Sequence, residues 1–327
     1  MNRRTLLTSG TAATALTVLG SATAAHATPA GSVTPRPRPA GVYPEVADTS
    51  HASAKATTFF RDYFTAKTQR DLDAFANTFH PRQSAYFDAT LGMGAVFTSR
   101  AGVKEMFAPL MAAWGPGAKC YPLRILGNTD SAIVAFVDTP EMFGAELRII
   151  SAIDFKDGKI TRQVDYWDGR RNPVTNFRGP LDQYPHSLGS ETVRPNASPT
   201  IDKIARRLNA ALAAGDATNA ATLFSADAVF EDITTRTTLQ GKLAIGRYLQ
   251  RALPELPYGP GTTVRHTLGS AQGGGYEWLT DAKPVPNGIT ALELDHQGKI
   301  TRFTAVWDGS RLTDSAAKSL AARSIED

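Results

Sequence analysis

An internal repeat constrains the fold of this chain more than any other feature of its sequence. Residues 157–171 (DGKITRQVDYWDGRR) match residues 297–311 (QGKITRFTAVWDGSR) at nine of 15 positions, without a gap. Upstream, residues 84–88 (SAYFD) parallel residues 228–232 (AVFED) at a similar offset. A period this long indicates two whole domains of roughly 120 residues, not a solenoid of short repeats.

Length and composition agree with two folded domains and exclude several other classes of protein. The 327 residues allow about two domains. The content of 42% hydrophobic and 20% charged residues excludes wholesale disorder. The single cysteine, Cys120, excludes a disulfide framework and a thiolate zinc cluster. The six histidines show no ligand-like spacing, so we expect no metal site, although a site built from carboxylates alone stays open.

The amino-terminal residues 1–27 have the pattern of an export signal. Arg3 and Arg4 precede a weakly apolar stretch that ends in Ala-His-Ala, the small-x-small pattern that a signal peptidase reads. The start resembles a twin-arginine signal, so we expect a secreted protein that is cleaved near Ala27. Cleavage leaves 33 basic and 31 acidic residues. So small an excess does not favour a nucleic-acid partner, and no later apolar run is long enough to span a membrane.

The remaining chain divides at two segments that are rich in proline and lack hydrophobic periodicity. The predicted parts are the signal peptide 1–27, a proline-rich tether 28–48, a first domain 49–171, a linker 172–199 that holds five prolines, and a second domain 200–327 that ends in a helix near 313–325.

Each domain is predicted to run from helices to strands. Helical spacing of apolar residues and strand-like alternation place the elements. In the first unit these are helices at 52–67, 70–79 and 100–113, and strands at 84–90, 119–126, 131–139, 146–155 and 159–168. In the second unit they are helices at 200–213, 217–224 and 241–252, and strands at 227–233, 262–270, 274–280, 287–295 and 299–307. Segregated helices and strands indicate α+β domains, each a curved antiparallel sheet with helices across one face.

This order of elements resembles the cone-shaped superfamily of nuclear transport factor 2 (NTF2-like). The motifs that carry the resemblance are a strand ending in Val-Phe-Glu-Asp and a closing strand with Gly-Lys-Ile-Thr-Arg and Trp-Asp. The chain is most similar to the SnoaL-like polyketide cyclase, ketosteroid isomerase and limonene epoxide hydrolase branches, over residues 50–171 and 200–311. The resemblance implies two tandem cones, each with an apolar pocket, that pair through their sheets as an intrachain pseudo-dimer.

Alternation along the last strand of the first unit places Asp165 inside the cone. Asp165 shares a face with Gln163 and Trp167. The matching face of the second unit carries Phe303 and Ala305, the apolar composition expected of an interior. A carboxylate in an apolar cavity has a raised pKa and can transfer protons near neutral pH. The alternative is that the opposite face is buried and that Asp165 is solvated.

Asp138 ends an earlier strand and shares its face with Phe136. In the epoxide hydrolases that this chain resembles, one aspartate lies on this strand and a second lies in an Arg-Asp-Tyr-Phe-Asp stretch on the last strand. The resemblance maps these two aspartates onto Asp138 and Asp165. The arginine of that family falls at Phe136, so the catalytic triad is incomplete here. The alternative for Asp138 is a turn residue at the end of the strand.

Asp88 and Tyr63 match two parts of the ketosteroid isomerases. In that family the general base lies at the end of the strand to which Asp88 belongs. A tyrosine on the first helix, eight residues before the aspartate of a turn, donates to the oxyanion. Tyr63 lies eight residues before Asp71. The resemblance therefore implies an aspartate base with a tyrosine donor, which suits proton transfer next to a carbonyl. The alternative is that Tyr63 is a core residue.

The second unit lacks part of this set, because Leu208 and Ala305 stand where the first unit has Tyr63 and Asp165. We therefore expect chemistry in the first unit and a structural or altered pocket in the second. The predicted substrate-binding residues are Trp167, Phe136, Tyr86, Phe59 and Gln163. The predicted residues of the second pocket are Asp232, Glu277 and Trp307.

These observations predict an exported enzyme that uses carboxylate acid–base catalysis on a small hydrophobic molecule. The resemblance implies an isomerase or cyclase acting on a polyketide-, steroid- or terpenoid-like substrate, without a cofactor. Two alternatives remain open at this point. One is an epoxide hydrolase, in which water is activated between Asp138 and Asp165, and the other is a secreted protein that binds a small ligand without catalysis.

Overall fold

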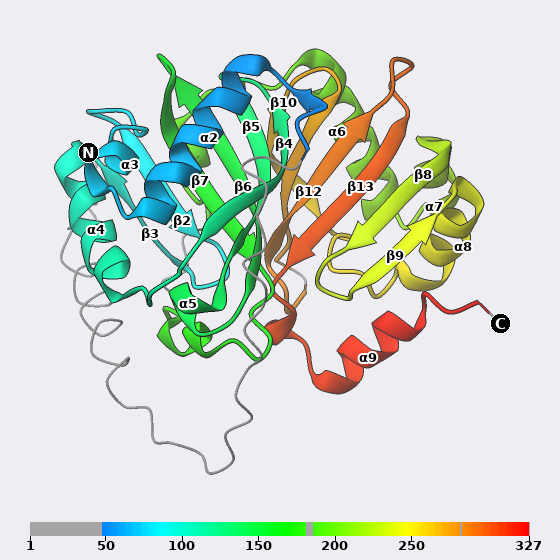
Figure 1. Cartoon of the computed structure of the whole chain (residues 1–327). Helices are drawn as coiled ribbons and strands as arrows, with labels where there is room; N and C mark the ends of the chain where they lie inside the picture. The colour runs from blue at the N-terminus through cyan, green and yellow to red at the C-terminus, as the bar shows by residue number, and fades with distance from the viewer. Residues whose placement is uncertain (1–47, 181–185, 282, 327) are drawn as a thin grey trace, which may run out of the picture.

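The computed structural model describes residues 48–180, 186–281 and 283–326. The predicted signal peptide and nearly all of the tether lie outside the described residues. Figure 1 shows two units side by side, each with its own curved sheet, and the expected α+β fold is confirmed.

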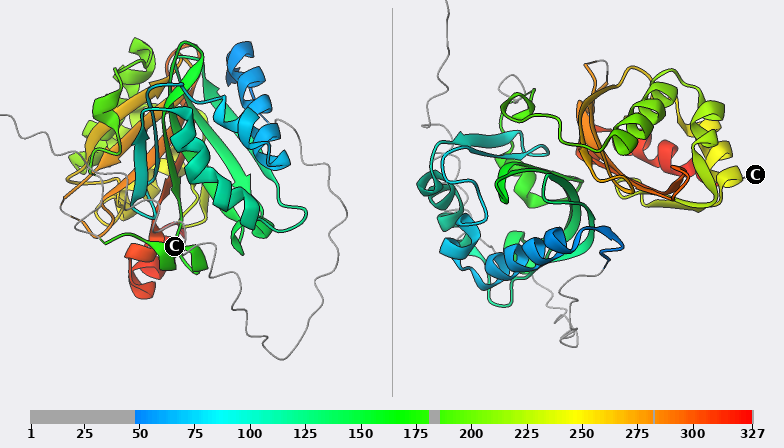
Figure 2. Two further views of the ribbon diagram at one scale, coloured as in Figure 1. Left: turned by 90° about the vertical axis from the view of Figure 1, so that its left-hand side faces the viewer. Right: turned by 90° about the horizontal axis from the view of Figure 1, so that it is seen from above.

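The first unit holds a seven-stranded sheet in the order β1-β4-β5-β6-β7-β2-β3. Its strands are β1 (His51–Ala52), β2 (Ser84–Asp88), β3 (Met93–Phe97), β4 (Cys120–Gly127), β5 (Ser131–Asp138), β6 (Leu147–Lys156) and β7 (Lys159–Trp167). Its helices are α2 (Ala54–Gln69), α3 (Leu72–Ala76), α4 (Arg100–Ala113) and the single turn α5 (Pro140–Phe143). The helices cover the concave face of the sheet, as the right-hand view of Figure 2 shows.

The second unit repeats this topology with a six-stranded sheet in the order β10-β11-β12-β13-β8-β9. Its strands are β8 (Phe224–Asp232), β9 (Thr237–Gln240), β10 (Thr263–Gly269), β11 (Gly273–Leu279), β12 (Asn287–Leu294) and β13 (Ile300–Trp307). Its helices are α6 (Pro199–Ala213), α7 (Ala217–Thr222), α8 (Lys242–Ala252) and α9 (Asp314–Ala322). Short 3-10 turns lie at Pro173–Phe177, Ser190–Thr192 and Gly309–Arg311.

Equivalent local signals in the two halves begin equivalent elements. Ser53 and Ser198 each cap the first helix of a unit through a side-chain oxygen. Asp71 and Asp216 cap the second helices in the same way, because an Asp side chain satisfies the free backbone N–H groups of a first helical turn. The two units therefore repeat both in sequence and in local conformation.

Sequence patterns locate the long elements to within a few residues but miss the short ones. The predicted helix at 100–113 coincides with α4, and the predicted strands of both sheets end within three residues of the observed ones. The patterns miss β3, β9 and α5. These elements have only four or five residues, too few to show a period, and β3 and β9 exist because β2 and β8 offer them a free edge.

The convex faces of the two sheets pack against each other and form a third core of the molecule. Strand residues that point away from the cones alternate with interior residues, as strand geometry requires. This shared core consists of Ala85, Phe87, Ala89, Leu126, Ile133, Ile150, Ala152, Val164, Tyr166, Leu188, Leu268, Ile289, Ala291 and Val306. It joins residues from both sheets, so the two units meet through a continuous apolar layer.

A buried charge network lies within this interface. Arg162 Nη2 is 2.7 Å from Glu277 Oε2 of the other sheet, and its Nη1 is 3.2 Å from Asp154 Oδ2. The Tyr166 hydroxyl donates to Glu277 Oε1 at 2.5 Å. His266 Nε2 lies 2.8 Å from Asp154 Oδ1. The Arg162 side chain is fully buried, so these contacts replace the hydration that its charge loses.

A run of glycines lets the two sheets approach closely at one edge. A Cβ atom on Gly273 would lie 2.6 Å from the Cβ of His51, in the first unit, and 3.3 Å from that of Leu126. Residues 273–275 open β11 and pair with β12. None of the described helices is both long enough and apolar enough to cross a membrane.

Candidate active site

Asp165 is the centre of a polar cluster inside the first cone. Its carboxylate accepts hydrogen bonds from the Tyr86 hydroxyl at 2.7 Å, from Gln163 Nε2 at 3.0 Å and from the Ser151 hydroxyl. Asp165 is 3% exposed, and its face of β7 also carries Trp167, which belongs to the apolar core of this unit. The sheet residues that face the cone are therefore those that alternation predicts.

Burial raises the pKa of Asp165 above its ordinary value. The positive charge of Lys67 and the hydrogen bonds from Ser151, Gln163 and Tyr86 lower the pKa of this carboxyl, but they do not cancel the cost of desolvation. The same burial raises the pKa of the Tyr86 hydroxyl, and the adjacent charge of Asp165 adds to that rise. Tyr86 therefore stays protonated and can only donate to the carboxylate.

Asp88 lies beside Asp165 across the parallel pairing of β2 and β7. Its Oδ2 accepts a hydrogen bond from Trp167 Nε1 at 2.9 Å, and its Oδ1 accepts from the backbone N–H groups of Thr90 and Leu91. Burial raises the pKa of Asp88 to about 7, and the charge of Asp165 contributes to the rise. Its side chain remains partly exposed. Asp88 therefore combines access with a pKa at which it exchanges protons near neutrality.

Tyr63 projects from α2 into the same interior and is 1% exposed. Its hydroxyl donates to Gln163 Oε1 at 3.1 Å, and the amide of Gln163 in turn donates to Asp165. Burial raises the pKa of Tyr63 well above its usual range. Tyr63 is thus connected to the carboxylate through one side chain and not directly.

A buried ion pair occupies the far side of the interior. Lys67 Nζ lies 3.2 Å from both carboxylate oxygens of Asp138 and 4.9 Å from the centre of the Phe136 ring. Asp138 is therefore half of an ion pair and not a free proton donor. Burial and Asp138 raise the pKa of the neighbouring Cys120 thiol, so the thiol stays protonated within the apolar core.

The sequence analysis misses Lys67 and Ser151. Lys67 follows Tyr63 by one helical turn on the stripe of α2 that faces the core, and a lysine on such a stripe is a signal for a buried charge. Ser151 faces Asp165 directly across β6 and β7. Its position could be found only from the register between the strands, which the sequence does not specify.

Aromatic side chains fill most of the remaining interior. Tyr63 lies 5.1 Å from Phe75, Phe75 lies 4.7 Å from Phe107, and Phe107 lies 5.0 Å from Tyr86, all measured between ring centres. Phe59, predicted to bind substrate, is partly exposed and packs edge-on against Phe155. Near β3, the residues Tyr86, Asp88 and Met93 are half-buried.

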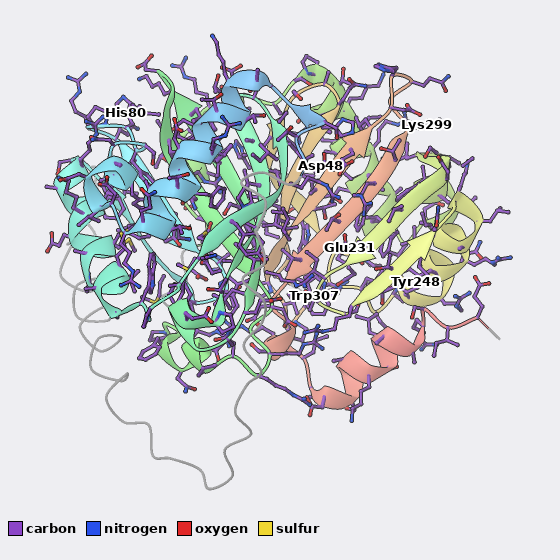
Figure 3. All side chains as sticks on the ribbon, viewed as in Figure 1. Asp48, His80, Glu231, Tyr248, Lys299 and Trp307 are labelled. Atoms are coloured by element: carbon purple, nitrogen blue, oxygen red, sulfur yellow. The ribbon has the colours of Figure 1, made fainter. Side chains whose placement is uncertain are left out.

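The second cone keeps one part of this arrangement. Asp232 Oδ2 accepts a hydrogen bond from Trp307 Nε1 at 3.1 Å, as Asp88 does from Trp167. Asp232 is fully buried, and Tyr258 also donates to it, at 3.0 Å. Figure 3 places Trp307 near the end of β13 and Tyr248 on α8. Because the aspartate–tryptophan pair occurs in both units, it belongs to the architecture that they share.

The rest of the polar cluster is replaced in the second cone. The strand registers place Ala305 at the position of Asp165, Phe303 at that of Gln163 and Phe230 at that of Tyr86. Phe230 and Phe303 stack with their ring centres 4.6 Å apart. Leu208, the counterpart of Tyr63, is fully buried.

The sequence analysis expects Glu277 to line the second cone, but in the structure it does not. Its neighbours Tyr276 and Trp278 belong to the core of the second unit, so Glu277 points to the opposite face and pairs with Arg162 across the sheets. The strand registers show that Trp278 corresponds to Phe136 of the first unit. Glu277 therefore corresponds to Ala135 and not to Asp138. The prediction places Glu277 on the correct strand and on the wrong face, because a shift of one residue reverses the side of the sheet.

Two cavities formed by the described residues lie outside the first cone. One of about 440 Å³ lies on the second unit beside α6, and a void of about 10 Å³ lies between the sheets near Ile133. Neither is lined by Asp165, Asp88 or Tyr63. Within the described ranges, no three His, Cys, Asp or Glu side chains are grouped to hold a metal ion.

Comparison with known proteins agrees with the fold. Residues 60–163 match the family model of the SnoaL-like domain, and no curated protein matches the chain. Among solved structures, a steroid delta-isomerase from Pseudomonas aeruginosa is similar at 15% identity and a TM-score of 0.31, over 40% of this chain and 93% of that one.

Two further structures show the same range of similarity. A candidate polyketide cyclase from Sinorhizobium meliloti is 22% identical, with a TM-score of 0.28, over 33% of this chain and 93% of its own. An NTF2-like protein of unknown function from Burkholderia xenovorans is 18% identical, with a TM-score of 0.30, over 43% of this chain and 94% of its own.

Proposed function

We propose that this chain, whose residues 60–163 form a SnoaL-like domain, is a cofactor-independent isomerase or cyclase that acts on a small hydrophobic molecule in the first cone. One observation carries the proposal. The first cone holds a hydrogen-bonded cluster around Asp165, whereas the second cone has Ala305, Phe303 and Phe230 at the corresponding positions.

The second unit serves as an internal control for what the fold requires. It forms the same sheet order with apolar side chains at these positions, so the cluster is not needed for folding. Burying polar groups costs free energy even when they are paired. The architecture does not need this cluster, and its Asp165 carboxyl contributes to the raised pKa, about 7, of the neighbouring Asp88, which supports a role in chemistry.

Asp88 is the proposed general base. It would accept a proton from a carbon next to a substrate carbonyl, and the C–H electron pair would move into the enolate that forms. A hydroxyl of Tyr86 or Tyr63 would then turn from its acceptor, Asp165 or Gln163, to the developing oxyanion. Protonated Asp88 would return the proton to a different carbon, so the isomerisation needs no co-reactant.

Access to the site requires side chains to move. The partly exposed Tyr86, Asp88 and Met93 mark the side from which a substrate would enter. An interior built from aromatic rings favours a flat, apolar substrate with one carbonyl group, such as a polyketide-, steroid- or terpenoid-like molecule. Asp138 is held by Lys67, which leaves Asp88 and Asp165 as the carboxylates available for chemistry.

Hydrogen–deuterium exchange tests the proposal without a known substrate. The protein is incubated in D2O with a panel of apolar enolisable ketones, and deuterium at the α-carbon is followed by mass spectrometry. We expect exchange that Asp88→Asn reduces at least 100-fold and that Asp165→Asn reduces strongly. The matched control is Asp232→Asn in the second cone, which should keep full exchange. Wild-type exchange no faster than that of Asp88→Asn would contradict the proposal.

The same preparation separates the alternative functions. Incorporation of oxygen-18 from solvent into a diol, from a panel of epoxides, would indicate an epoxide hydrolase instead. A compound that co-purifies unchanged, with no exchange and no diol, would indicate a binding protein. Either result would replace the isomerase proposal.

We further propose that the enzyme acts after export. The support is the Arg3–Arg4 pair followed by an apolar stretch and Ala-His-Ala. Amino-terminal sequencing of the protein from the culture medium should give a start at Thr28, and replacing both arginines by lysine should retain the protein inside the cell. An extracellular protein that still carries residues 1–27 would contradict the predicted cleavage.

A further inference from the structure

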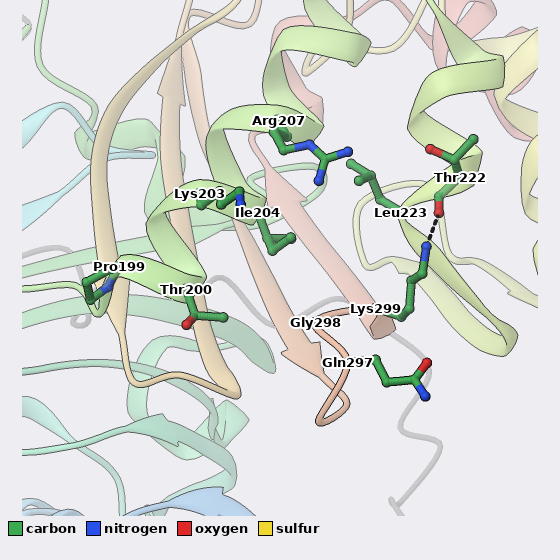
Figure 4. Close-up of a pocket in the computed structure, with 10 residues that line it drawn as sticks. All are labelled: Pro199, Thr200, Lys203, Ile204, Arg207, Thr222, Leu223, Gln297, Gly298 and Lys299. Atoms are coloured by element: carbon green, nitrogen blue, oxygen red, sulfur yellow. Dashed lines mark hydrogen bonds between the residues drawn. The ribbon is translucent and has the colours of Figure 1, made fainter.

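A cavity of about 440 Å³ lies on the second unit, and its walls include Ile204 and Leu223 of the apolar core of that unit. This volume falls within the roughly 300–1,000 Å³ that is typical of small-molecule sites. Figure 4 shows α6 on one side of the cavity and the turn between β12 and β13 on the other. Its lining residues are Pro199, Thr200, Lys203, Ile204, Arg207, Thr222, Leu223, Gln297, Gly298 and Lys299.

The charges around this cavity have a single sign. Lys203, Arg207 and Lys299 line it, and no carboxylate does so among the described residues. Lys299 Nζ donates to the backbone oxygen of Thr222 at 2.9 Å, which fixes the ammonium at the wall. Lys203 and Arg207 have no hydrogen-bond or ion-pair partner within the described part of the chain, so both can donate to a ligand.

The acidic side chain in the turn between β12 and β13, that of Asp295, forms hydrogen bonds within the turn. Asp295 Oδ1 accepts hydrogen bonds from the backbone N–H groups of Gln297 and Lys299, at 2.9 Å and 2.8 Å. On α6, Asp202 pairs with Arg206 and accepts from Thr267. These carboxylates are therefore hydrogen-bonded within the protein, and neither of them lines the cavity.

Comparison of the units explains why the cavity opens in the second one. The first helix of each unit begins after a capping serine, and Leu208 stands where the first unit has Tyr63. By the same alignment, Ile204 corresponds to Phe59. In the first unit the Phe59 ring packs against Phe155, with ring centres 5.0 Å apart. The second unit has the smaller Ile204 and Leu294 there, so a ring-sized volume is left unfilled.

The same comparison shows that the charge is specific to the second unit. Arg207 corresponds to Asp62 and Lys203 to Thr58, whereas the anchoring contact is shared, because Lys159 Nζ donates to Asn77 O as Lys299 does to Thr222 O. At this place the second unit therefore has smaller apolar side chains and two positive charges beyond the lysine that both units share.

We propose that this cavity binds a small multivalent oxyanion, a phosphate ester or a polycarboxylate. Three cations within one concave surface attract a group with more than one negative charge. The planar guanidinium of Arg207 can donate two parallel hydrogen bonds to phosphate or carboxylate oxygens. Phosphate and carboxylate share this chemistry, and the experiment distinguishes them. The site is separate from the proposed active site and does not depend on its function.

Titration calorimetry with two probes tests the site on the full-length mature protein. Pyrophosphate and citrate are titrated separately at one ionic strength, because ion binding weakens with salt. We expect saturable binding of at least one probe with a stoichiometry of one. Tighter pyrophosphate binding assigns the site to phosphates, and tighter citrate binding assigns it to polycarboxylates. Binding of neither probe at millimolar concentration overturns the proposal.

Two variants locate the site. Arg207→Glu should weaken binding at least tenfold. Lys318→Glu, an equal change of charge at an exposed position of α9, should leave it unchanged. Equal weakening by both variants would show that general electrostatic attraction and not the cavity binds the anion.

A third variant tests the cavity independently of charge. Ile204→Phe introduces the side chain that fills this place in the first unit, and it should weaken binding at least fivefold. Thermal unfolding of each variant shows whether it is folded. A folded Ile204→Phe protein with wild-type affinity would contradict the assignment.

Discussion

Asp168 and Asp308 bind each other's loop in a reciprocal contact between the two units. Asp168 Oδ1 accepts a hydrogen bond from the backbone N–H of Gly309 at 3.1 Å, and Asp308 Oδ1 accepts one from Gly169 at 3.2 Å. The two aspartates hold the same place in the sequence repeat. Such an exchange is the property of a two-fold interface, in which each copy gives and receives the same contact.

Replacing either aspartate by alanine should lower the stability of the folded protein. Asp168→Ala should lower the free energy of unfolding by about 1–2 kcal/mol, because a buried N–H loses its acceptor. Asp308→Ala should cost more, since the pair of Asp308 with Arg178 at 2.6 Å is less exposed than the pair of Asp168 with Arg170 at 2.9 Å. Urea denaturation measures both, with the exposed Asp130→Ala as control. An equal, negligible effect of all three variants would show that the reciprocal contact does not stabilise the protein.

The buried pair of Arg162 and Glu277 should be sensitive to loss of one partner. Although burial acts to raise it, the charges of Arg162 and Arg265 hold the pKa of Glu277 below its ordinary value. Glu277→Gln should cost about 3–5 kcal/mol, because it removes the closer of the two carboxylates that pair with the fully buried Arg162.

The control for this prediction is a surface pair. Glu231→Gln removes a partner of Arg302 at 3.6 Å, with both side chains about one third exposed, and should cost under about 1 kcal/mol. Guanidinium denaturation compares the variants. A Glu277→Gln protein as stable as Glu231→Gln would contradict the role given to the network.

Replacing the polar cluster of the first cone by the corresponding residues of the second cone should preserve the fold and abolish catalysis. The fourfold variant carries Tyr86→Phe, Ser151→Thr, Gln163→Phe and Asp165→Ala, the residues that the second cone has at these positions. Its unfolding free energy should stay close to that of the wild type, because apolar residues replace most of a buried polar network and this gain offsets the loss of Gln163 as acceptor for the Tyr63 hydroxyl.

The single variant Asp165→Ala gives the contrast. It leaves three donors without their acceptor and should cost about 1–3 kcal/mol. Thermal and urea unfolding, together with the deuterium-exchange assay, provide the readouts. If the fourfold variant is less stable than Asp165→Ala, the cluster is structural, and the argument for catalysis from the internal control is lost.

Asp88 should make stability depend on pH in a defined direction. Burial raises its pKa to about 7 in the folded protein, while the unfolded chain ionises near its ordinary value of about 4. The folded state therefore retains the proton longer. The contribution of Asp88 to the free energy of unfolding is therefore most favourable below about pH 4. It falls as the pH rises from about 4 to about 7, and it is constant at higher pH.

The Asp88→Asn variant isolates this contribution. The difference in unfolding free energy between wild type and Asp88→Asn should change by roughly 2–4 kcal/mol across this window. Urea denaturation at half-unit pH steps measures it. A difference that is flat with pH, or that changes in the opposite direction, rejects the assignment of a raised pKa to Asp88.

The sequence alone determined the duplication, the α+β class and the long elements. The Gly-Lys-Ile-Thr-Arg repeat, the capping residues Ser53 and Ser198, and the apolar stripes of the helices are local signals, and local physics acts on them directly. Alternation along β7 also placed Asp165 inside the cone, because side chains alternate between the two faces of a strand whatever its partners are.

Only the tertiary structure decided which groups meet. Ser151 reaches Asp165, Lys67 reaches Asp138 and Glu277 reaches Arg162 because of strand register and the packing of the two sheets. A change of register by one residue would move Glu277 to the opposite face at no cost visible in its own segment. Neither these contacts nor the cavity beside Arg207 could be read from the sequence, since each depends on side chains that lie far apart in the chain.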